Sequence, residues 1–94
     1  MPIKSFKDKE TEKVFGTQFS KRFPPEIQRR AVKRMKTLNA AAKLGDLAAL
    51  LGNHLEALRG DRKGQHSIRI NDQWRVCFIW KDGEAHAVEI ADYH

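Results

Sequence analysis

The sequence predicts an α+β fold, in which helices from the first half of the chain pack on one face of a sheet built mainly from the second half. Apolar residues between positions 27 and 42 recur every three or four residues, which is the period of an amphipathic helix. From about residue 67 the period changes to two, as in a half-buried strand. Ninety-four residues suffice for a modest core. We therefore expect one compact domain over residues 1–94, with an antiparallel-rich sheet in the order β-α-α-β-β-β.

The composition is that of a basic globular protein. Eighteen Lys and Arg residues against 12 Asp and Glu give a formal charge of +6, and such a field attracts nucleic acid and other polyanions. The longest apolar run is far shorter than the roughly 20 residues that cross a bilayer. The N-terminus also lacks the apolar segment of a secretory signal. We therefore expect a cytoplasmic protein without a membrane partner.

The first elements are a short strand and a helix. Ile3 and Phe6 are the only large apolar residues before Asp8, and we expect a short strand there, although their spacing of three is not strand alternation. Asp8 is well suited to cap a helix that runs to about Phe15. The Gly-Thr pair that follows should end this helix.

A long amphipathic helix follows the two prolines after Phe23, since proline is tolerated in a first helical turn. Its apolar face is predicted to comprise Ile27, Ala31, Met35, Leu38 and Ala42. Its polar face is predicted to comprise Gln28, Arg29, Arg30, Lys33, Arg34 and Lys36. Such a basic face is usually a solvated surface, and the sharper alternative is contact with an acidic partner or RNA. Residues 47–51 suit a short helical turn.

From about residue 67 the chain is expected to form a hairpin of two strands, and the length of its turn decides which face of the sheet each residue occupies. A two-residue turn would put the apolar residues of the two strands on opposite faces. A loop over residues 71–73 instead pairs Ile70 with Trp74 and Ile68 with Val76, and we expect this register. One face then carries all the large apolar residues, namely Ile68, Ile70, Trp74, Val76, Phe78 and Trp80. Asp82-Gly83 supplies the next turn, and residues 85–91 form a last strand with Val88 and Ile90 inward.

The same register places Arg69 opposite Arg75 on the other face, beside Gln65, Ser67 and Cys77. Like charges directly across two strands are destabilising. We therefore expect an anion between the two guanidinium groups. The alternative is that either arginine pairs with Asp72 or Glu89.

Metal, thiol and mononucleotide chemistry are not indicated. The four histidines, His54, His66, His86 and His94, lack ligand spacing, and no metal or other cofactor is expected. The single cysteine, Cys77, lies among apolar residues, where a structural thiol is expected rather than an activated one. Gly60 and Gly64 precede a strand pattern and not a helix, so they do not form a phosphate-binding loop.

Metal-free cleavage of RNA fits the remaining residues better. This reaction needs a base for the 2′-hydroxyl, positive charge for the phosphate and an acid for the leaving oxygen. Planar, permanently charged guanidinium groups match phosphate oxygens. The terminal Asp92, Tyr93 and His94 offer proton transfer, although such residues also occur as packing or frayed ends. The candidates for stabilising the phosphate are Arg59, Arg62, Arg69 and Arg75, and Lys63 and His66 belong to the same basic stretch of the sequence.

Taken together, the opening segment IKSFKD, the block GNHLEALRGDRKGQHSIRINDQWRVCF and the closing VEIADYH make the chain resemble the RelE/ParE superfamily of bacterial toxins. It is most similar to the HigB-like branch. The resemblance implies a toxin that enters the A site of the 70S ribosome and cuts translated mRNA. It also implies a cognate HigA-like helix-turn-helix antitoxin, through which alone the toxin would meet operator DNA.

The resemblance further implies roles for individual residues. Arg59 and Arg75 would stabilise the phosphate, and Asp92, Tyr93 and His94 would form the acid-base group. Glu56 departs from the family pattern, which can carry histidine at this position. The general base is therefore left open between Glu56, His54 and His94. Further RNA contacts are implied for Arg62, Lys63, Arg69, Asn71 and His54.

Two other functions stay open at this point. The first is a protein-binding poison of DNA gyrase, as the resemblance to the ParE branch of the same superfamily implies. The terminal Asp-Tyr-His argues against this function. A non-catalytic RNA-binding module is the other alternative. It predicts that Tyr93 and His94 are dispensable.

Overall fold

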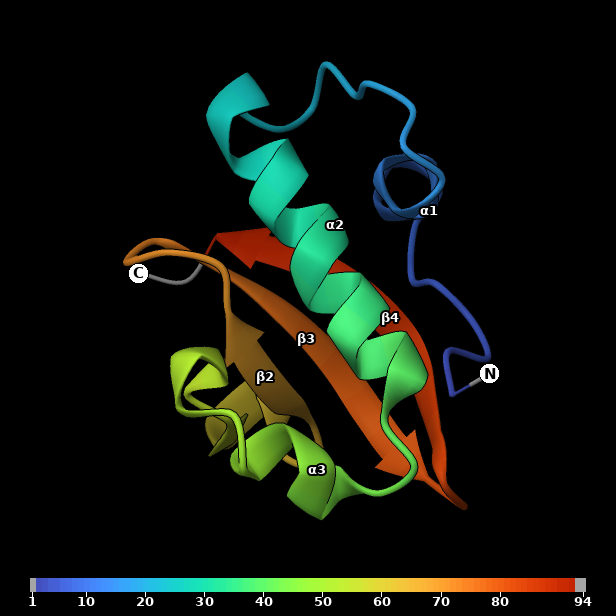
Figure 1. Cartoon of the computed structure of the whole chain (residues 1–94), viewed down its shortest axis with the longest axis vertical. Coiled ribbons are helices and arrows are strands. Elements are labelled where there is room, and N and C mark those ends of the chain that lie inside the picture. The colour runs from blue at the N-terminus through green and yellow to red at the C-terminus, as the bar shows by residue number, and fades with distance from the viewer. Residues whose placement is uncertain (1, 93–94) are drawn as a thin grey trace.

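A computed structural model describes residues 2–92 of the chain. It confirms the α+β class: a four-stranded antiparallel sheet in the order β1-β2-β3-β4, with helices on one face. In Figure 1, α2 lies across the front of β3 and β4, and α1 packs beside it. The elements are α1 (Lys9–Phe15), α2 (Pro25–Ala40), α3 (Leu44–Ala48), β1 (Glu56–Ala57), β2 (His66–Arg69), β3 (Trp74–Lys81) and β4 (Glu84–Asp92), with 3₁₀ turns at Leu51–Asn53 and Gly60–Arg62.

Within residues 2–92, the N-terminal segment joins the sheet through two isolated bridges. Ile3 pairs with Ala85 and Phe6 with Val88, in parallel orientation. The backbone N–H groups of Lys4 and Lys7 donate to strand β4 at 2.8 and 2.9 Å. The predicted first strand is therefore reduced to these bridges. A short strand that the sequence did not predict, β1, lies at the opposite edge of the sheet.

The predicted helix cap at Asp8 is confirmed. Its carboxylate accepts a hydrogen bond from the backbone N–H of Thr11 at 2.7 Å, and α1 ends at Phe15 before Gly16. This bond satisfies one of the donors that a helix N-terminus leaves unpaired.

Replacing Asp8 with alanine is expected to lower the free energy of unfolding by about 1 kcal/mol, because the first turn of α1 loses its cap. Chemical denaturation measures the change. Asp8→Asn should retain most of the stability, since asparagine also caps, and it separates the cap from the ion pair of Asp8 with Arg22 at 3.6 Å. Glu12→Ala, which removes an exposed acid from the same helix, is the matched control. Equal losses for Asp8→Ala and Glu12→Ala would contradict the capping role.

The buried face of α2 was predicted correctly at four of its five positions. Ile27, Ala31, Met35 and Leu38 are buried against the sheet. The prediction was wrong for Ala42, which is exposed beyond the end of the helix. The backbone turns extended at residue 41, so the helical period stops there and the alanine at that position is buried instead.

Gln28 was wrongly assigned to the polar face of α2, since its side chain is only 8% exposed. Its amide nitrogen donates to the backbone carbonyls of Ser20 and Phe23 at 2.7 and 2.8 Å, and its amide oxygen accepts from the Ser20 N–H at 3.1 Å. A buried amide is tolerated when its donors and acceptors are satisfied. Gln28 therefore ties the loop between α1 and α2 to the second helix.

The predicted hairpin register is confirmed. The pairs Ile68 with Val76 and Arg69 with Arg75 form as expected, and the Ile70 N–H donates to the Trp74 carbonyl at 2.9 Å. The loop is held by an asparagine side chain, because Asn71 Oδ1 accepts from two backbone N–H groups that follow it. The face toward the helices carries the core, formed with α2 by Ile68, Ile70, Val76, Phe78, Ala85, Val88 and Ile90, and flanked by Trp74 and Trp80.

Strand β4 contains a bulge that the sequence did not predict. Cys77 pairs with Glu89 whereas Ile79 pairs with His86, so β4 has one extra residue at this point. Ala87 takes the left-handed conformation there, with φ of 51°. The bulge reverses the alternation of side chains between the two faces of β4, which allows both Ala85 and Val88 to face the core. None of the helices within residues 2–92 combines the length and apolar character that a membrane span requires.

Candidate functional site

The face of the sheet that points away from α2 carries Glu56, Arg69 and Arg75 among the predicted site residues, and we call it the outer face. Cross-strand pairing places Glu56, Ser67, Cys77 and Glu89 in one row across all four strands. Arg69, Arg75 and Ala91 form the next row. Paired residues share a face of a sheet, so the register brings both rows together on one surface. The segment after β1 contributes Leu58, which packs with Cys77 and Ala91.

Arg75 is buried within the outer face, and its side chain is only 8% exposed. Its Nε donates to Ser67 Oγ at 2.6 Å, and its Nη2 donates to the backbone carbonyl of His54 at 2.5 Å. The same nitrogen lies 3.3 Å from Glu56 Oε1. A buried charge is tolerated when it is paired and hydrogen-bonded. Arg75 therefore fixes the chain around His54 and Glu56 against β2.

Arg69 and Arg75, which face each other across β2 and β3, form ion pairs with different carboxylates. Arg69 forms an ion pair with Asp72, which confirms one of the two pairings considered as alternatives to an anion. Glu89 instead pairs with Arg62 at 2.8 Å. Arg75 pairs with Glu56, a partner that the sequence did not indicate, because the contact depends on the unpredicted strand β1. A phosphate on this face must therefore compete with carboxylates that the chain itself supplies.

Arg62 and Glu89 belong to a charged cluster on the outer face, on the β4 side of the sheet. Glu89 forms ion pairs with both Arg62 and Lys7, and Lys7 Nζ lies 3.1 Å from Glu89 Oε2. Arg62 also donates a hydrogen bond to Gln65 Oε1 at 3.1 Å. Neither Lys7 nor Gln65 was among the residues predicted to bind RNA. Burial raises the pKa of the neighbouring Cys77 thiol, as expected of a structural cysteine.

Arg59 and Lys63 differ from the other cations. Both are exposed, and within residues 2–92 neither has a carboxylate at ion-pair distance. They flank the 3₁₀ turn Gly60–Arg62, which follows β1. These two cations can receive a phosphate without first losing a carboxylate partner.

Two predicted residues hold the backbone, and a third lies on the core side of the sheet. His54 is exposed, has a left-handed φ of 44°, and accepts the Arg75 hydrogen bond with its carbonyl. Asn71 uses its side-chain oxygen to hold the 71–73 loop. His66, which the sequence grouped with the basic candidates, lies on the core side of the sheet and stacks on Phe78 at 6.2 Å. His66 therefore belongs to the core side of the sheet and not to the basic outer face.

Asp92 is the last described residue, and β4 brings it beside the hairpin loop. It pairs with Trp74 across the sheet, and its carboxylate accepts from Gln73 Nε2 at 3.0 Å. A cavity of 300 Å³ lies next to it, lined in part by Asp92, Arg62 and Arg22. Arg22 was not predicted, because its loop is distant in sequence. Tyr93 and His94 lie outside the described residues.

Comparisons with known proteins identify the family to which the chain is similar. The family described as the RelE-like toxin of the type II toxin-antitoxin system HigB matches residues 4–94. Endoribonuclease HigB of Proteus vulgaris is 32% identical over 92 residues, which cover 98% of this chain and 99% of that protein. Toxin HigB-1 of Vibrio cholerae is 38% identical over 81 residues, which cover 85% of each chain. The family model and the Proteus vulgaris protein therefore cover nearly the whole chain, and the Vibrio cholerae protein covers most of it.

Proposed function

Because the chain belongs to the family of RelE-like toxins of type II toxin-antitoxin systems of the HigB type, we propose that it is an endoribonuclease that cuts translated mRNA on the ribosome. The observation that carries the proposal is its similarity, over nearly the full length, to a protein named as an endoribonuclease. The basic outer face and the titratable C-terminal residues supply the groups that such a reaction needs. The same similarity supports treating residues 1–94 as one toxin domain.

The proposed reaction is metal-independent transesterification. The 2′-hydroxyl loses its proton to a base and attacks the adjacent phosphorus, so a 2′-O–P bond forms as the 5′-O–P bond breaks. An acid then protonates the leaving 5′-oxygen. The products are a 2′,3′-cyclic phosphate and a free 5′-hydroxyl. Negative charge on the equatorial phosphate oxygens increases toward the transition state, where fixed guanidinium groups lower the barrier most.

The exposed Arg59 suits direct contact with the phosphate, since it has no ion-pair partner within residues 2–92. Arg75 suits a positioning role, because its buried guanidinium holds Glu56 and the His54 carbonyl. Glu56, His54 and His94 are the candidates for the base. Asp92 and Tyr93 complete the proposed acid-base group. Arg62, Lys63, Arg69 and Asn71 are proposed to contact the mRNA.

The proposed biology follows from the same family. A cognate helix-turn-helix antitoxin of the HigA type would neutralise the toxin and carry it to operator DNA. The toxin would act in the cytoplasm, on the 70S ribosome, without a cofactor and without a membrane. Free toxin would then inhibit translation and arrest growth.

Mapping of mRNA 5′ ends after induction tests the function. New ends bearing a 5′-hydroxyl should appear within translated messages, and they should disappear for Arg59→Ala. Growth arrest without new ends would overturn the nuclease proposal. If altered DNA supercoiling and double-strand breaks accompanied that arrest, the ParE-like action on gyrase would replace it.

A further inference from the structure

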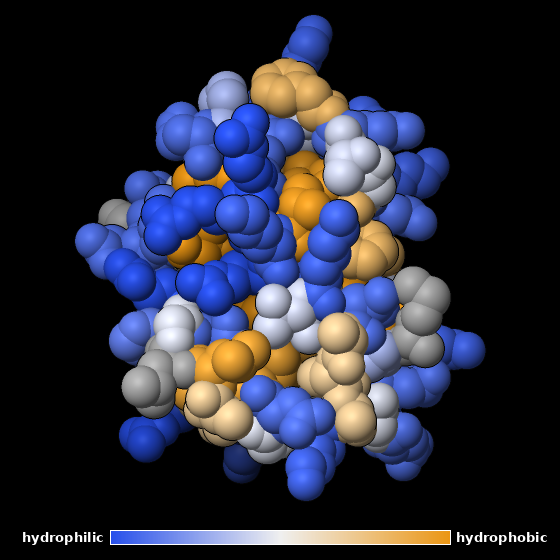
Figure 2. Space-filling view, viewed as in Figure 1, coloured by the Kyte–Doolittle hydropathy of each residue, from blue (hydrophilic) through white to orange (hydrophobic). Residues whose placement is uncertain are grey.

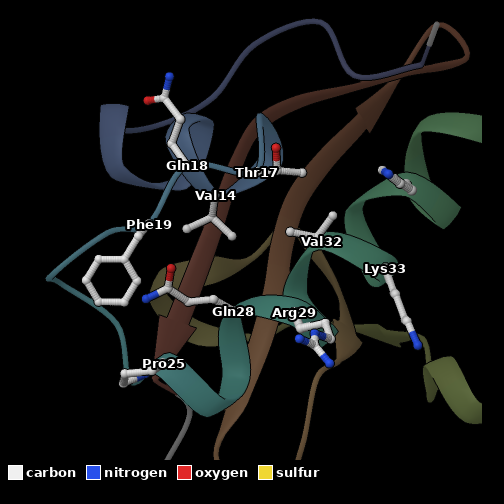
Figure 3. A pocket seen from close by; sticks show the side chains of 10 residues that line it. Val14, Thr17, Gln18, Phe19, Pro25, Gln28, Arg29, Val32 and Lys33 are labelled. Carbon is white, nitrogen blue, oxygen red and sulfur yellow. The ribbon is translucent and has the colours of Figure 1, made fainter.

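A groove lies between α1 and α2, on the opposite side of the sheet from the outer face. It encloses 500 Å³, and its floor and walls include Val14, Phe19, Pro25 and Val32. Figure 3 shows the side chains of Val14 and Val32 approaching one another across the groove, with Phe19 and Pro25 toward one end. The proposed cleavage reaction uses none of these residues. An apolar concavity of this kind is a common feature of binding sites.

Phe19 is an exposed aromatic residue on a fixed loop. Its side chain is 62% exposed, the highest value among the large exposed hydrophobic residues of the described chain. The next residue, Ser20, is fully buried and is held by Gln28 and by Glu10, whose carboxylate accepts from Ser20 Oγ at 2.7 Å. The ring is therefore presented by an ordered backbone, so the loop itself loses little conformational entropy when a partner covers the ring.

Basic side chains line the α2 side of the groove. Arg29, Lys33 and Lys36 follow one another at spacings of four and three residues, so they form a single stripe along the helix. All three are exposed, and no carboxylate within residues 2–92 lies at ion-pair distance from them. Lys13 of α1, in contrast, pairs with Glu10. In Figure 2, hydrophobic atoms on this face appear between such hydrophilic side chains.

We propose that this groove binds an acidic amphipathic helix of the cognate antitoxin. The inference rests on the proposed function only in that it takes the chain to be a toxin with an antitoxin partner. Apolar residues of the helix would pack on Val14, Val32 and Phe19, and carboxylates along its edge would face the stripe formed by Arg29, Lys33 and Lys36. Helices dock in grooves through anchors at this same three- and four-residue spacing.

An RNA strand fits the groove less well. The nucleic-acid backbone gains little from an aliphatic floor, and Phe19 offers only one ring for base stacking. The arginines proposed to hold mRNA lie across the sheet. The unpaired cations beside an apolar floor therefore favour a protein helix that has both carboxylates and apolar anchors.

Titration of the full-length toxin with the purified antitoxin of the same system tests the proposal by calorimetry. Phe19→Asp and Lys33→Glu should each weaken binding on the order of 10- to 100-fold, because one removes a central aromatic anchor and the other reverses an attractive charge. Each variant, produced without antitoxin, should still arrest growth and cut mRNA. Leu50→Asp and Lys81→Glu are the matched controls, since they introduce the same acidic side chains at exposed positions outside the groove, in place of a large apolar residue and a lysine.

Unchanged antitoxin affinity for both groove variants would overturn the proposal. Cleavage lost with unchanged antitoxin affinity would also overturn it and would assign the groove to RNA. The wild type could also sediment as a dimer that Phe19→Asp dissociates, while the antitoxin affinity stays unaffected. That result would overturn the proposal and assign the groove to a second copy of the chain. If the toxin cut no mRNA but the groove variants still bound the antitoxin more weakly, the docking site would be supported and the proposed enzyme activity would be contradicted.

Discussion

Deletion of Tyr93 and His94 is expected to reduce the rate of mRNA cleavage by about 10²- to 10⁴-fold, the usual contribution of general acid-base catalysis. The deletion removes a phenol and an imidazole that the proposed mechanism uses for proton transfer. The deletion leaves Asp92 in the chain, together with the contact of its carboxylate with Gln73. Thermal unfolding of the deletion variant checks that the domain still folds. Single-turnover cleavage on programmed ribosomes measures the loss.

Two point variants separate the roles within this deletion. Tyr93→Phe retains the ring and removes the hydroxyl, whereas His94→Gln retains hydrogen bonding and removes the titratable group. The variant that carries the proton transfer should lose most of the rate and should alter the pH profile of cleavage. Cleavage at the wild-type rate after deletion of both residues would contradict a catalytic C-terminus and would favour the non-catalytic RNA-binding module.

Arg75→Ala is expected to lower both cleavage and stability, whereas Arg59→Ala should lower cleavage alone. Truncation of Arg75 leaves Ser67 Oγ and the His54 carbonyl without this donor, and we expect a loss of about 2–3 kcal/mol in the free energy of unfolding. Arg59 is exposed, so its truncation should change that free energy by less than about 0.5 kcal/mol. Denaturation curves and single-turnover rates, measured on both variants, provide the comparison.

A double-mutant cycle tests whether Arg75 acts through Glu56. If Arg75 positions Glu56, then Glu56→Ala should cost little additional rate in the Arg75→Ala background, because the two side chains act as a unit. Additive losses would instead indicate that Arg75 contacts the phosphate directly, as the family resemblance implies. Arg75→Lys keeps the charge without the planar fork and should not restore the wild-type rate. Equal stability of Arg75→Ala and Arg59→Ala would contradict the buried, structural role of Arg75.

The predictions from sequence succeeded where the pattern was local. The Asp8 cap and the 71–73 loop depend on residues within a few positions of one another, and both were found as expected. They failed where the outcome depended on distant segments. Gln28 is buried because a loop eight residues away needs its amide, and Arg75 pairs with Glu56 because β1 joins the sheet. The periodicity of a single helix or strand does not show which distant segments will contact it.

The sequence by itself determined the α+β class, the register of the hairpin and the placement of Arg69 and Arg75 on the same outer face, because side chains alternate strictly along paired strands. Only the tertiary structure decided which charges meet. It joined Lys7 and Arg62 to Glu89, and it formed the groove between α1 and α2. Ion pairs and grooves depend on the three-dimensional packing of segments far apart in the chain, which local sequence patterns do not encode.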